Sequence, residues 1–213
     1  VVDNETRAWI GDSATVKAAG LASVDADSSQ DVLSVVVGGA GGGTAGVAAS
    51  GATNVFNPLT QAWIGAGAQL NVGETLLSQS ARVSAESVTE LLSIVGTVGI
   101  GGTAGVGGAA DVVVLDKTTQ AWIAAGGSNV RIGDTLWVLA DSSEEVRSVG
   151  AGFGVGGTAG VQGAASVVVL DTDTQAYIAG GAPAQTERHV DAAATRATQR
   201  DPVPAAGADG GTP

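Results

Sequence analysis

The hexapeptide GGTAGV occurs three times in this chain of 213 residues, at positions 42–47, 101–106 and 156–161. It carries no charged side chain and no group that commonly catalyses a reaction. Its Gly and Ala residues add little volume to the backbone. Repetition of such an inert sequence indicates a role in the path of the chain, not in chemistry.

A second pattern follows each hexapeptide at a fixed distance. It consists of Thr, a variable residue, Ala, an aromatic residue and Ile, and its aromatic residues are Trp9, Trp63, Trp122 and Tyr177. Each hexapeptide begins 21 residues before the next aromatic residue, whereas 33, 38 or 34 residues separate an aromatic residue from the next hexapeptide. One half of the unit has the constant length that stacking requires, and the other half accepts insertions, as an outward loop does.

The repeat predicts an all-β protein. Valine-rich runs such as 112–115 and 167–170 are typical of strands, and residues 21–26 and 136–141 alternate with period two. Successive aromatic residues lie 54, 59 and 55 positions apart. Since this is long for one coil of a β-solenoid, we expect about three coils of roughly 18 to 20 residues per repeat. Ten such coils would form a rod about 50 Å long.

The hexapeptide glycines are predicted to lie at corners of the coil. There the backbone turns sharply or two coils approach closely, and a larger side chain would obstruct the neighbouring coil. These structural glycines are Gly42, Gly43, Gly46, Gly101, Gly102, Gly105, Gly156, Gly157 and Gly160.

Composition excludes several classes of function. The net charge of −12 argues against binding to nucleic acid or to anionic membrane surfaces. The absence of Cys excludes a disulfide framework, a thiol nucleophile and a Cys-based zinc site. With 34 Gly and few aromatic residues, the core is expected to consist of thin, closely spaced layers.

The glycine-rich segments have two other interpretations. Residues 41–46 and 152–157 match the GxGxxG pattern of dinucleotide sites, but the middle copy breaks it and no amphipathic helix follows. The uncharged segments 32–56, 91–110 and 148–170 are long enough to cross a bilayer. Their excess of Gly over Leu and Ile, without flanking Lys or Arg clusters, makes membrane insertion the lesser alternative.

No catalytic, cofactor-binding or metal-binding residue is predicted, and we expect the protein not to be an enzyme. Acidic residues cluster, and Ca²⁺ uses such oxygen ligands, so a Ca²⁺ site stays an alternative to solvated loops. The clusters are Asp25, Asp27 and Asp31; Asp141, Glu144 and Glu145; and Asp171 and Asp173. His189 is the only histidine, which excludes a site with two histidine ligands.

The recurring aromatic residues Trp9, Trp63, Trp122 and Tyr177 are the candidate contacts to a ligand or partner. Strand alternation places Ala62 and Ile64 on one face and Trp63 on the other, so each ring points outward if Ala and Ile line the interior. One ring in every third coil gives a spacing of roughly 14 Å. The rings then either stack on sugars or partner proteins, or cover the loops of their own repeats.

Two regions are expected in the chain. Residues 1–181 form the solenoid, with repeats at about 6–59, 60–118 and 119–173 and a partial repeat at 174–181. Residues 182–213 are predicted to be a largely irregular linker or tail with a short helix around 187–199. Because the chain starts at Val1 without Met or a signal peptide, we expect it to be part of a longer protein.

The combined repeat resembles the long repeats of secreted bacterial adhesins that are similar to filamentous haemagglutinin and leukotoxin. The motifs that carry this resemblance are TxA[WY]I, a coil such as GDTLWV or GLASVDA, GGTAGV, and a valine-rich strand, over residues 6 to about 181.

The resemblance implies a right-handed parallel β-helix that acts as a non-catalytic structural or adhesive fibre, secreted and located outside the cell or on its surface. Its expected partners are further copies of itself, by end-to-end or lateral assembly, or glycans and proteins of the host or cell surface. Two alternatives remain: a module that binds glycans or ice through outward aromatic or Thr residues, and a self-assembling filament subunit.

Overall fold

Parallel strands dominate the computed structural model, which describes residues 1–72, 78–126, 129–180, 184–186 and 189–196. Within these residues there is no helix. The strands are β1 (Val2–Ile10), β2 (Thr15–Val16), β3 (Leu21–Gly42), β4 (Ala45–Ile64), β5 (Gln69–Leu70), β6 (Ser80–Gly101), β7 (Ala104–Ile123), β8 (Asn129–Ile132), β9 (Thr135–Gly156), β10 (Ala159–Ile178), β11 (Ala184–Thr186) and β12 (His189–Arg196).

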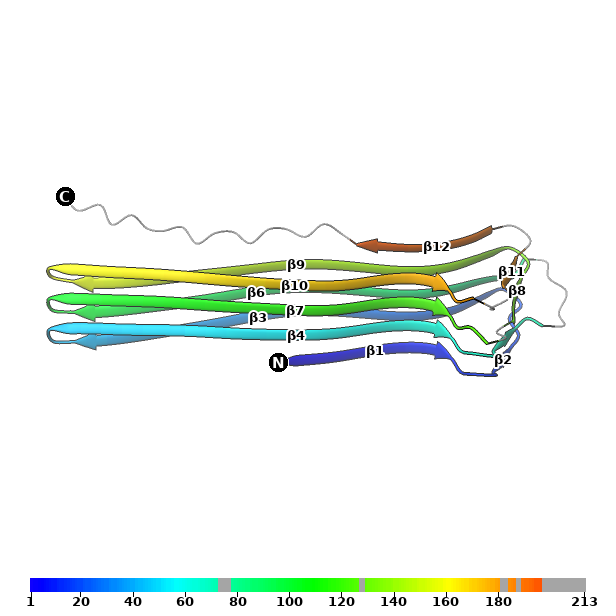
Figure 1. Ribbon diagram of the computed structural model, residues 1–213, viewed down its shortest axis with the longest axis horizontal. Helices are drawn as coiled ribbons and strands as arrows, with labels where there is room; N and C mark the ends of the chain where they lie inside the picture. Colours follow the sequence, from blue (N-terminus) through cyan, green and yellow to red (C-terminus); the bar gives the residue numbers. More distant parts are fainter. Residues whose placement is uncertain (73–77, 127–128, 181–183, 187–188, 197–213) are drawn as a thin grey trace.

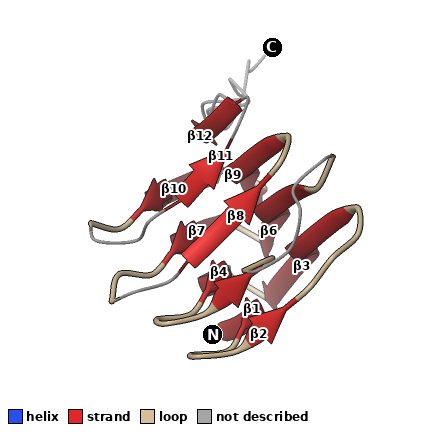
Figure 2. Ribbon diagram, turned by 90° about the vertical axis from the view of Figure 1, so that its right-hand side faces the viewer, coloured by secondary structure: helices blue, strands red, loops and turns tan. Residues whose placement is uncertain are grey.

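The strands form three parallel sheets. The first long sheet has the order β1-β4-β7-β10, the second long sheet has the order β12-β9-β6-β3, and the short sheet has the order β11-β8-β5-β2. The two long sheets pack against each other. At one end, the proximal end, the short sheet joins them, and at the other, the distal end, tight turns join them directly (Figures 1 and 2). The molecule is a flat blade, and the all-β class with stacked parallel strands agrees with the prediction.

One repeat makes one circuit of the three sheets. Trp63 pairs with Trp9 on one side and with Trp122 on the other, so neighbouring strands carry equivalent residues of successive repeats. The expectation of about three coils per repeat is therefore wrong. Three coils per repeat would require short strands, but in the structure β3 and β6 each continue for 22 residues through Val, Ala and Gly without interruption.

This winding changes the expected shape. Neighbouring strands in a sheet lie about 4.8 Å apart, so the first long sheet is only about 15 Å wide, whereas a strand of 22 residues is about 70 Å long. The long axis of the blade runs along the strands (Figure 1). The expected rod about 50 Å long along the stacking direction is corrected accordingly.

The hexapeptide GGTAGV forms the distal turn of each circuit. Residues 43–44, 102–103 and 157–158 connect the second long sheet to the first. Adjacent turns are hydrogen-bonded, since Thr103 N donates to Thr44 O at 2.8 Å and Thr158 N to Thr103 O at 2.9 Å. A Cβ atom on Gly42, Gly101 or Gly156 would fall on a backbone carbonyl across its own turn. Such a turn admits no larger residue at these positions.

Beyond the turns, the two long sheets approach so closely that their backbones touch. A Cβ atom on Gly46 would fall on the carbonyl of Ile100, and one on Gly105 would fall on that of Val155. Gly102, Gly157 and Gly160 have similar close backbone contacts, whereas a Cβ atom on Gly43 would meet nothing within 4 Å. Eight of the nine glycines singled out from the sequence thus lie where a side chain would collide with backbone.

The interior widens towards the short sheet. Midway along the blade, Phe56, Leu115 and Val146 form a buried cluster. Nearer the short sheet, a larger cluster includes Ile64 and Leu136. The volume of the inward side chains therefore sets the separation of the two long sheets, from backbone contact at the distal end to a full aliphatic layer at the proximal end.

The variable half of the repeat contains the connections of the short sheet. Between β5 and β6 the chain runs from Leu70 to Ser80, whereas β8 ends at Ile132 and β9 starts at Thr135. The extra residues of the second repeat therefore lie in the connection from β5 to β6, part of which falls outside the described residues. Before the short sheet, Ser13, Gly67 and Gly126 have positive φ angles of 57°, 69° and 91° at equivalent corners.

Two strands lie beyond the boundary predicted at residue 181. β11 pairs with β8 and β12 pairs with β9, both in parallel. The expectation of an irregular tail is wrong for residues 184–186 and 189–196, and the expected helix is a strand at 189–196. The alternation of Val190, Ala192 and Ala194 resembles that of Leu136, Val138 and Ala140 in β9, with which these residues pair. Residues 197–213 lie outside the described part of the chain.

Two glycines on β7 test the role of close backbone approach. A Cβ atom on Gly107 would fall on the carbonyl of Phe153, whereas one on Gly108, which faces outward, would meet nothing within 4 Å. Gly107→Ala should lower the free energy of unfolding by about 1–3 kcal/mol through overpacking. Gly108→Ala should leave it unchanged or raise it by up to about 1 kcal/mol, because Ala restricts the unfolded chain. Urea denaturation followed by circular dichroism measures both, and equal effects would contradict the arrangement of the sheets.

Candidate functional site

The four recurring aromatic residues form a single stacked column on the outer face of the first long sheet. The ring centroids of Trp9 and Trp63 lie 5.2 Å apart, those of Trp63 and Trp122 lie 5.0 Å apart, and those of Trp122 and Tyr177 lie 6.2 Å apart. Their planes differ by no more than 8°. The expected spacing of roughly 14 Å is wrong, because each circuit, and not every third coil, contributes one ring.

This aromatic column points outward, as the strand alternation predicts. Ala62 and Ile64 are buried, with 0% and 1% of their surface exposed, while Trp9 is 57% exposed. The rings nevertheless cover each other's faces. A sugar binds an aromatic residue through a free ring face, and stacking covers both faces of Trp63 and Trp122, so that these two rings show mainly their edges to solvent. The column is therefore better suited to holding circuits in register than to binding a row of sugars.

A column of polar residues runs beside the aromatic column. Arg7 Nε donates a hydrogen bond to Gln61 Oε1 at 3.0 Å, and Gln61 Nε2 donates to Gln120 Oε1 at 3.0 Å. Gln175 continues the same position in β10. Stacked aromatic rings and glutamine ladders are features of in-register parallel β-structure. This column was not predicted from the sequence, although the Gln residues recur at the same spacing as the rings.

The threonine of the same motif faces inward. Thr60 and Thr119 are 1% and 0% exposed. An ice-binding surface needs its threonines on a flat outer face, so these residues do not supply the array that the ice-binding alternative requires.

The interior contains a buried ion pair between the two long sheets. Lys117 Nζ lies 3.1 Å from Glu144 Oε1, and the two side chains are 0% and 2% exposed. Nζ also donates hydrogen bonds to the carbonyls of Ser87 at 2.7 Å and Ser143 at 3.1 Å. Three acceptors match the three N–H groups of an ammonium ion. Burial lowers the pKa of Lys117, an effect that the Glu144 carboxylate opposes.

Of the circuits that the structure describes, only one carries this pair. Asn4, Pro58 and Thr172 occupy the position of Lys117 in the other strands of the first long sheet, and Gln30 and Thr89 occupy that of Glu144 in the second. A buried charge is stable only beside its partner. The ion pair therefore forms only when β7 lies opposite β9 as observed. It would be lost if β7 were displaced by one circuit relative to the second long sheet.

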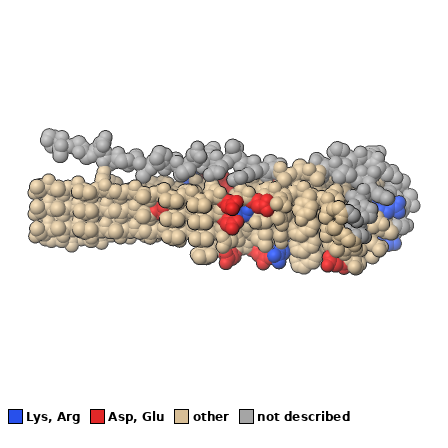
Figure 3. Space-filling model, viewed as in Figure 1, with Lys and Arg blue, Asp and Glu red and all other residues tan. Residues whose placement is uncertain are grey.

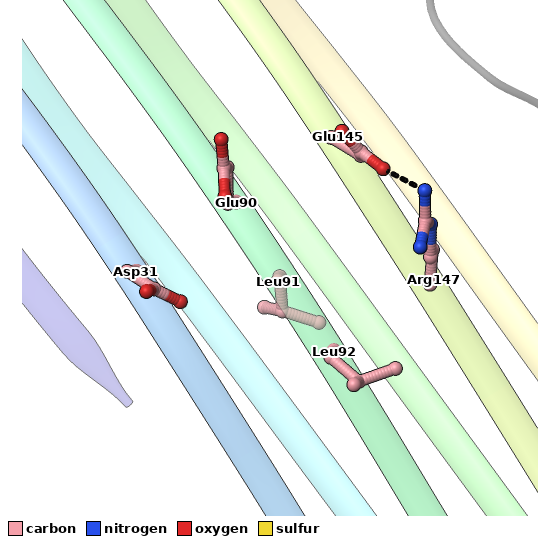
Figure 4. A pocket seen from close by; sticks show the side chains of 6 residues that line it. All are labelled: Asp31, Glu90, Leu91, Leu92, Glu145 and Arg147. Carbon is pink, nitrogen blue, oxygen red and sulfur yellow. Dashed lines mark ion pairs between the residues drawn. The ribbon is translucent and has the colours of Figure 1, made fainter.

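The acidic clusters lie on strands and not in solvated loops. On the outer face of the second long sheet, Asp31, Glu90 and Glu145 occupy equivalent positions of β3, β6 and β9. Figure 4 shows these three carboxylates on neighbouring strands, with Arg147 paired to Glu145. A shallow hollow of about 200 Å³ lies beside them, lined by Asp31, Glu90, Leu91, Leu92, Glu145 and Arg147.

Glu144 departs from the predicted cluster of Asp141, Glu144 and Glu145. It faces inward and binds Lys117, while Glu145 is on the outer face. Among the described residues, no group of three or more His, Cys, Asp or Glu side chains is arranged to hold a metal ion. The GxGxxG matches cover the ends of β3 and β9 and reach into the turns that follow. Each turn leads into another strand, without the helix that a dinucleotide site uses.

Charged residues gather at the proximal half of the blade (Figure 3). The uncharged segments 32–56, 91–110 and 148–170 make up most of the distal half. No helix in the described part of the chain is long and apolar enough to cross a membrane. Comparison with protein-family models, with curated proteins and with solved structures gave no match.

The contribution of the ion pair to stability is tested by comparing a single variant with a double variant. Lys117→Met leaves the Glu144 carboxylate buried without its partner, and should lower the free energy of unfolding by about 3–5 kcal/mol. The double variant Lys117→Met, Glu144→Met removes both charges and should recover most of that loss. Urea denaturation of both variants gives the comparison. A double variant as unstable as the single one would show that the two residues do not act as a unit.

The aromatic column is tested at its middle and at its end. Trp122→Ala removes two ring contacts and should cost about 1–3 kcal/mol of stability, whereas Tyr177→Ala removes one described contact and should cost less. Thermal and urea denaturation compare the variants, and a glycan array tests their binding. Unchanged stability together with lost glycan binding in Trp122→Ala would instead support a ligand site.

Proposed function

We propose that this chain is a non-catalytic structural segment of a bacterial surface fibre, folded as a right-handed parallel β-solenoid. The observation that supports this most strongly is the pairing of equivalent residues one repeat apart, from Ala8 with Ala62 and Ala121 to the stacked rings beside them. Such pairing lets each added repeat bind to the last in the same way. Right-handed winding is the usual hand for parallel strands joined by crossovers.

The placement of reactive groups favours a structural role over a catalytic one. Lys117 and Glu144 are enclosed between the long sheets and form an ion pair with each other. Asp111 is also buried and accepts a hydrogen bond from Ser148 Oγ. An active site needs such groups beside a cavity that admits substrate, and the hollow beside Glu90 is shallow.

The winding favours a broad ribbon over a slender stalk. Each repeat adds one strand, or about 4.8 Å, to the length of the stack. A stalk would gain little length from so much chain. A ribbon instead presents the same outer side chains again and again at this short interval, which suits adhesion to repetitive surfaces or lateral contact between fibres.

The extracellular location and the adhesive role rest on the resemblance to secreted filamentous adhesins. Surface glycans or proteins and further copies of the chain are the partners that this role requires. Since the rings of the aromatic column cover one another, we propose that adhesion uses the broad outer faces of the long sheets and not single exposed rings.

Removal of one repeat tests the modular solenoid. Deletion of residues 60–118 joins Leu59 to Thr119, which takes the place of its own pairing partner Thr60. One circuit is lost while every remaining strand keeps its register. Because Lys117 lies in the deleted segment, this deletion and its control are both made in the Lys117→Met, Glu144→Met variant, in which no buried charge is left without its partner. The shortened chain should retain a β-sheet circular dichroism spectrum and unfold at a lower urea concentration, because it has fewer contacts between circuits.

A control deletion of residues 60–108 removes a segment of similar length but shifts the register, and should not fold. If both deletions lose β-structure, or both keep it, the repeat is not the unit of assembly.

A further inference from the structure

The outer face of the second long sheet is apolar and exposed near the distal turns. We call the outward positions between residues 35 and 41 of β3, 94 and 100 of β6, and 149 and 155 of β9 the distal patch. All are uncharged. Val37 is 74% exposed, Ile100 53% and Phe153 48%. Its projected area, about 27 Å along the strands by about 14 Å across them, is roughly 400 Å².

Large and small residues alternate between the two central cross-strand rows of this patch. Val37, Gly96 and Ala151 form one cross-strand row, and Gly39, Val98 and Phe153 form the next. Along each strand, a residue with a large side chain therefore lies next to a Gly or Ala. If the face is turned end for end about a line between these two rows, each row falls on the other, and within these two rows every large residue meets a small one.

We propose that the distal patch binds the same patch of a second copy of this chain, with the strands of the two copies antiparallel. Val98 then lies opposite Gly96 of the second copy, and Phe153 lies opposite its Ala151. The same two-fold relation places Ile94 opposite Ile100. The contact is isologous and closes on itself, as in most homodimers. It does not depend on the function proposed above.

The charges of the proximal half select the antiparallel arrangement. In a parallel pair, the acidic column of Asp31, Glu90 and Glu145 would face its copy at the spacing of packed sheets, about 10 Å. In the antiparallel pair, Glu90 lies seven residues from the centre of the contact, so the two columns are about 46 Å apart along the strands. That exceeds the Debye length of about 8 Å at physiological salt.

The size of the patch limits the affinity. Two patches bury about 800 Å², which is below the usual range of stable interfaces. We therefore expect a reversible dimer that forms at micromolar or higher concentrations of the chain and tolerates high salt, because the contact is apolar. Longer arrays of the same repeat would bury more area in proportion to the number of circuits.

Gly96→Val fills the space that Val98 of the second copy needs. Within one copy, an added Cβ atom at Gly96 has only Val37 Cγ2 near it, at 4.0 Å, so the fold accommodates the change. The matched control is Gly108→Val, the same change on the outer face of the central strand of the first long sheet, where nothing lies within 4 Å of the added atom.

Sedimentation velocity of the full chain from 1 to 500 μM tests the proposal. The unmodified chain and Gly108→Val should dimerise alike, and the dissociation constant of Gly96→Val should rise at least tenfold while its urea midpoint is retained. A monomer at every concentration, or equal dimerisation of all three proteins, would overturn the interface. So would flotation of the monomer with phosphatidylcholine vesicles without dimer formation, which would assign the patch to lipid.

The orientation is tested separately with a spin label. Because the chain has no Cys, Glu90→Cys gives a single labelling position. Pulsed electron spin resonance should yield a distance of about 45–50 Å between labels in the antiparallel dimer. A distance near 10–20 Å would show a parallel pair and refute the proposed arrangement.

Discussion

The fold depends on one constraint: after each circuit the chain must return to a position where equivalent residues pair. Gly101 to Trp122 runs over the same 21 residues as Gly42 to Trp63, because this segment includes the distal turn and a complete strand of the first long sheet. One residue more or less would turn the inward side chains outward. The length differences among repeats are therefore confined to the connections of the short sheet, where no such alternation has to be kept.

The same constraint explains the gradient of composition along the blade. Sheets that meet at a two-residue turn are nearly in contact there, and only Gly fits between them, as at Gly46 and Gly105. With distance from the turn the sheets separate, and Ala, Val, Leu and Ile fill the widening space. The interior is thus wide enough for a lysine side chain only away from the turns. Lys117 lies in that part, with its charge matched by Glu144 from the opposite sheet.

Several features of the fold and site follow from residue patterns, and their limits have physical causes. The alternation of Ala62 and Ile64 with Trp63 along the strand predicts which face of the sheet is inward, and the repeat predicts the corner glycines. The same alternation places Lys117 on the inward face with Thr119 and Ala121. The sequence pattern was therefore sufficient to predict a buried charge at Lys117. The number of coils per repeat could not be read in this way, because Gly, Ala and Val are compatible both with turns and with uninterrupted strands.

The β class, the repeat unit, the inward and outward faces and the need for small residues at the turn can all be derived from the residue pattern, since they depend on local geometry and spacing. The tertiary structure decided how far each strand continues, that one repeat makes one circuit, and that Trp9, Trp63, Trp122 and Tyr177 stack instead of standing apart. It also decided the partner of Lys117. These features depend on contacts between residues that are tens of positions apart, and no local pattern specifies such contacts.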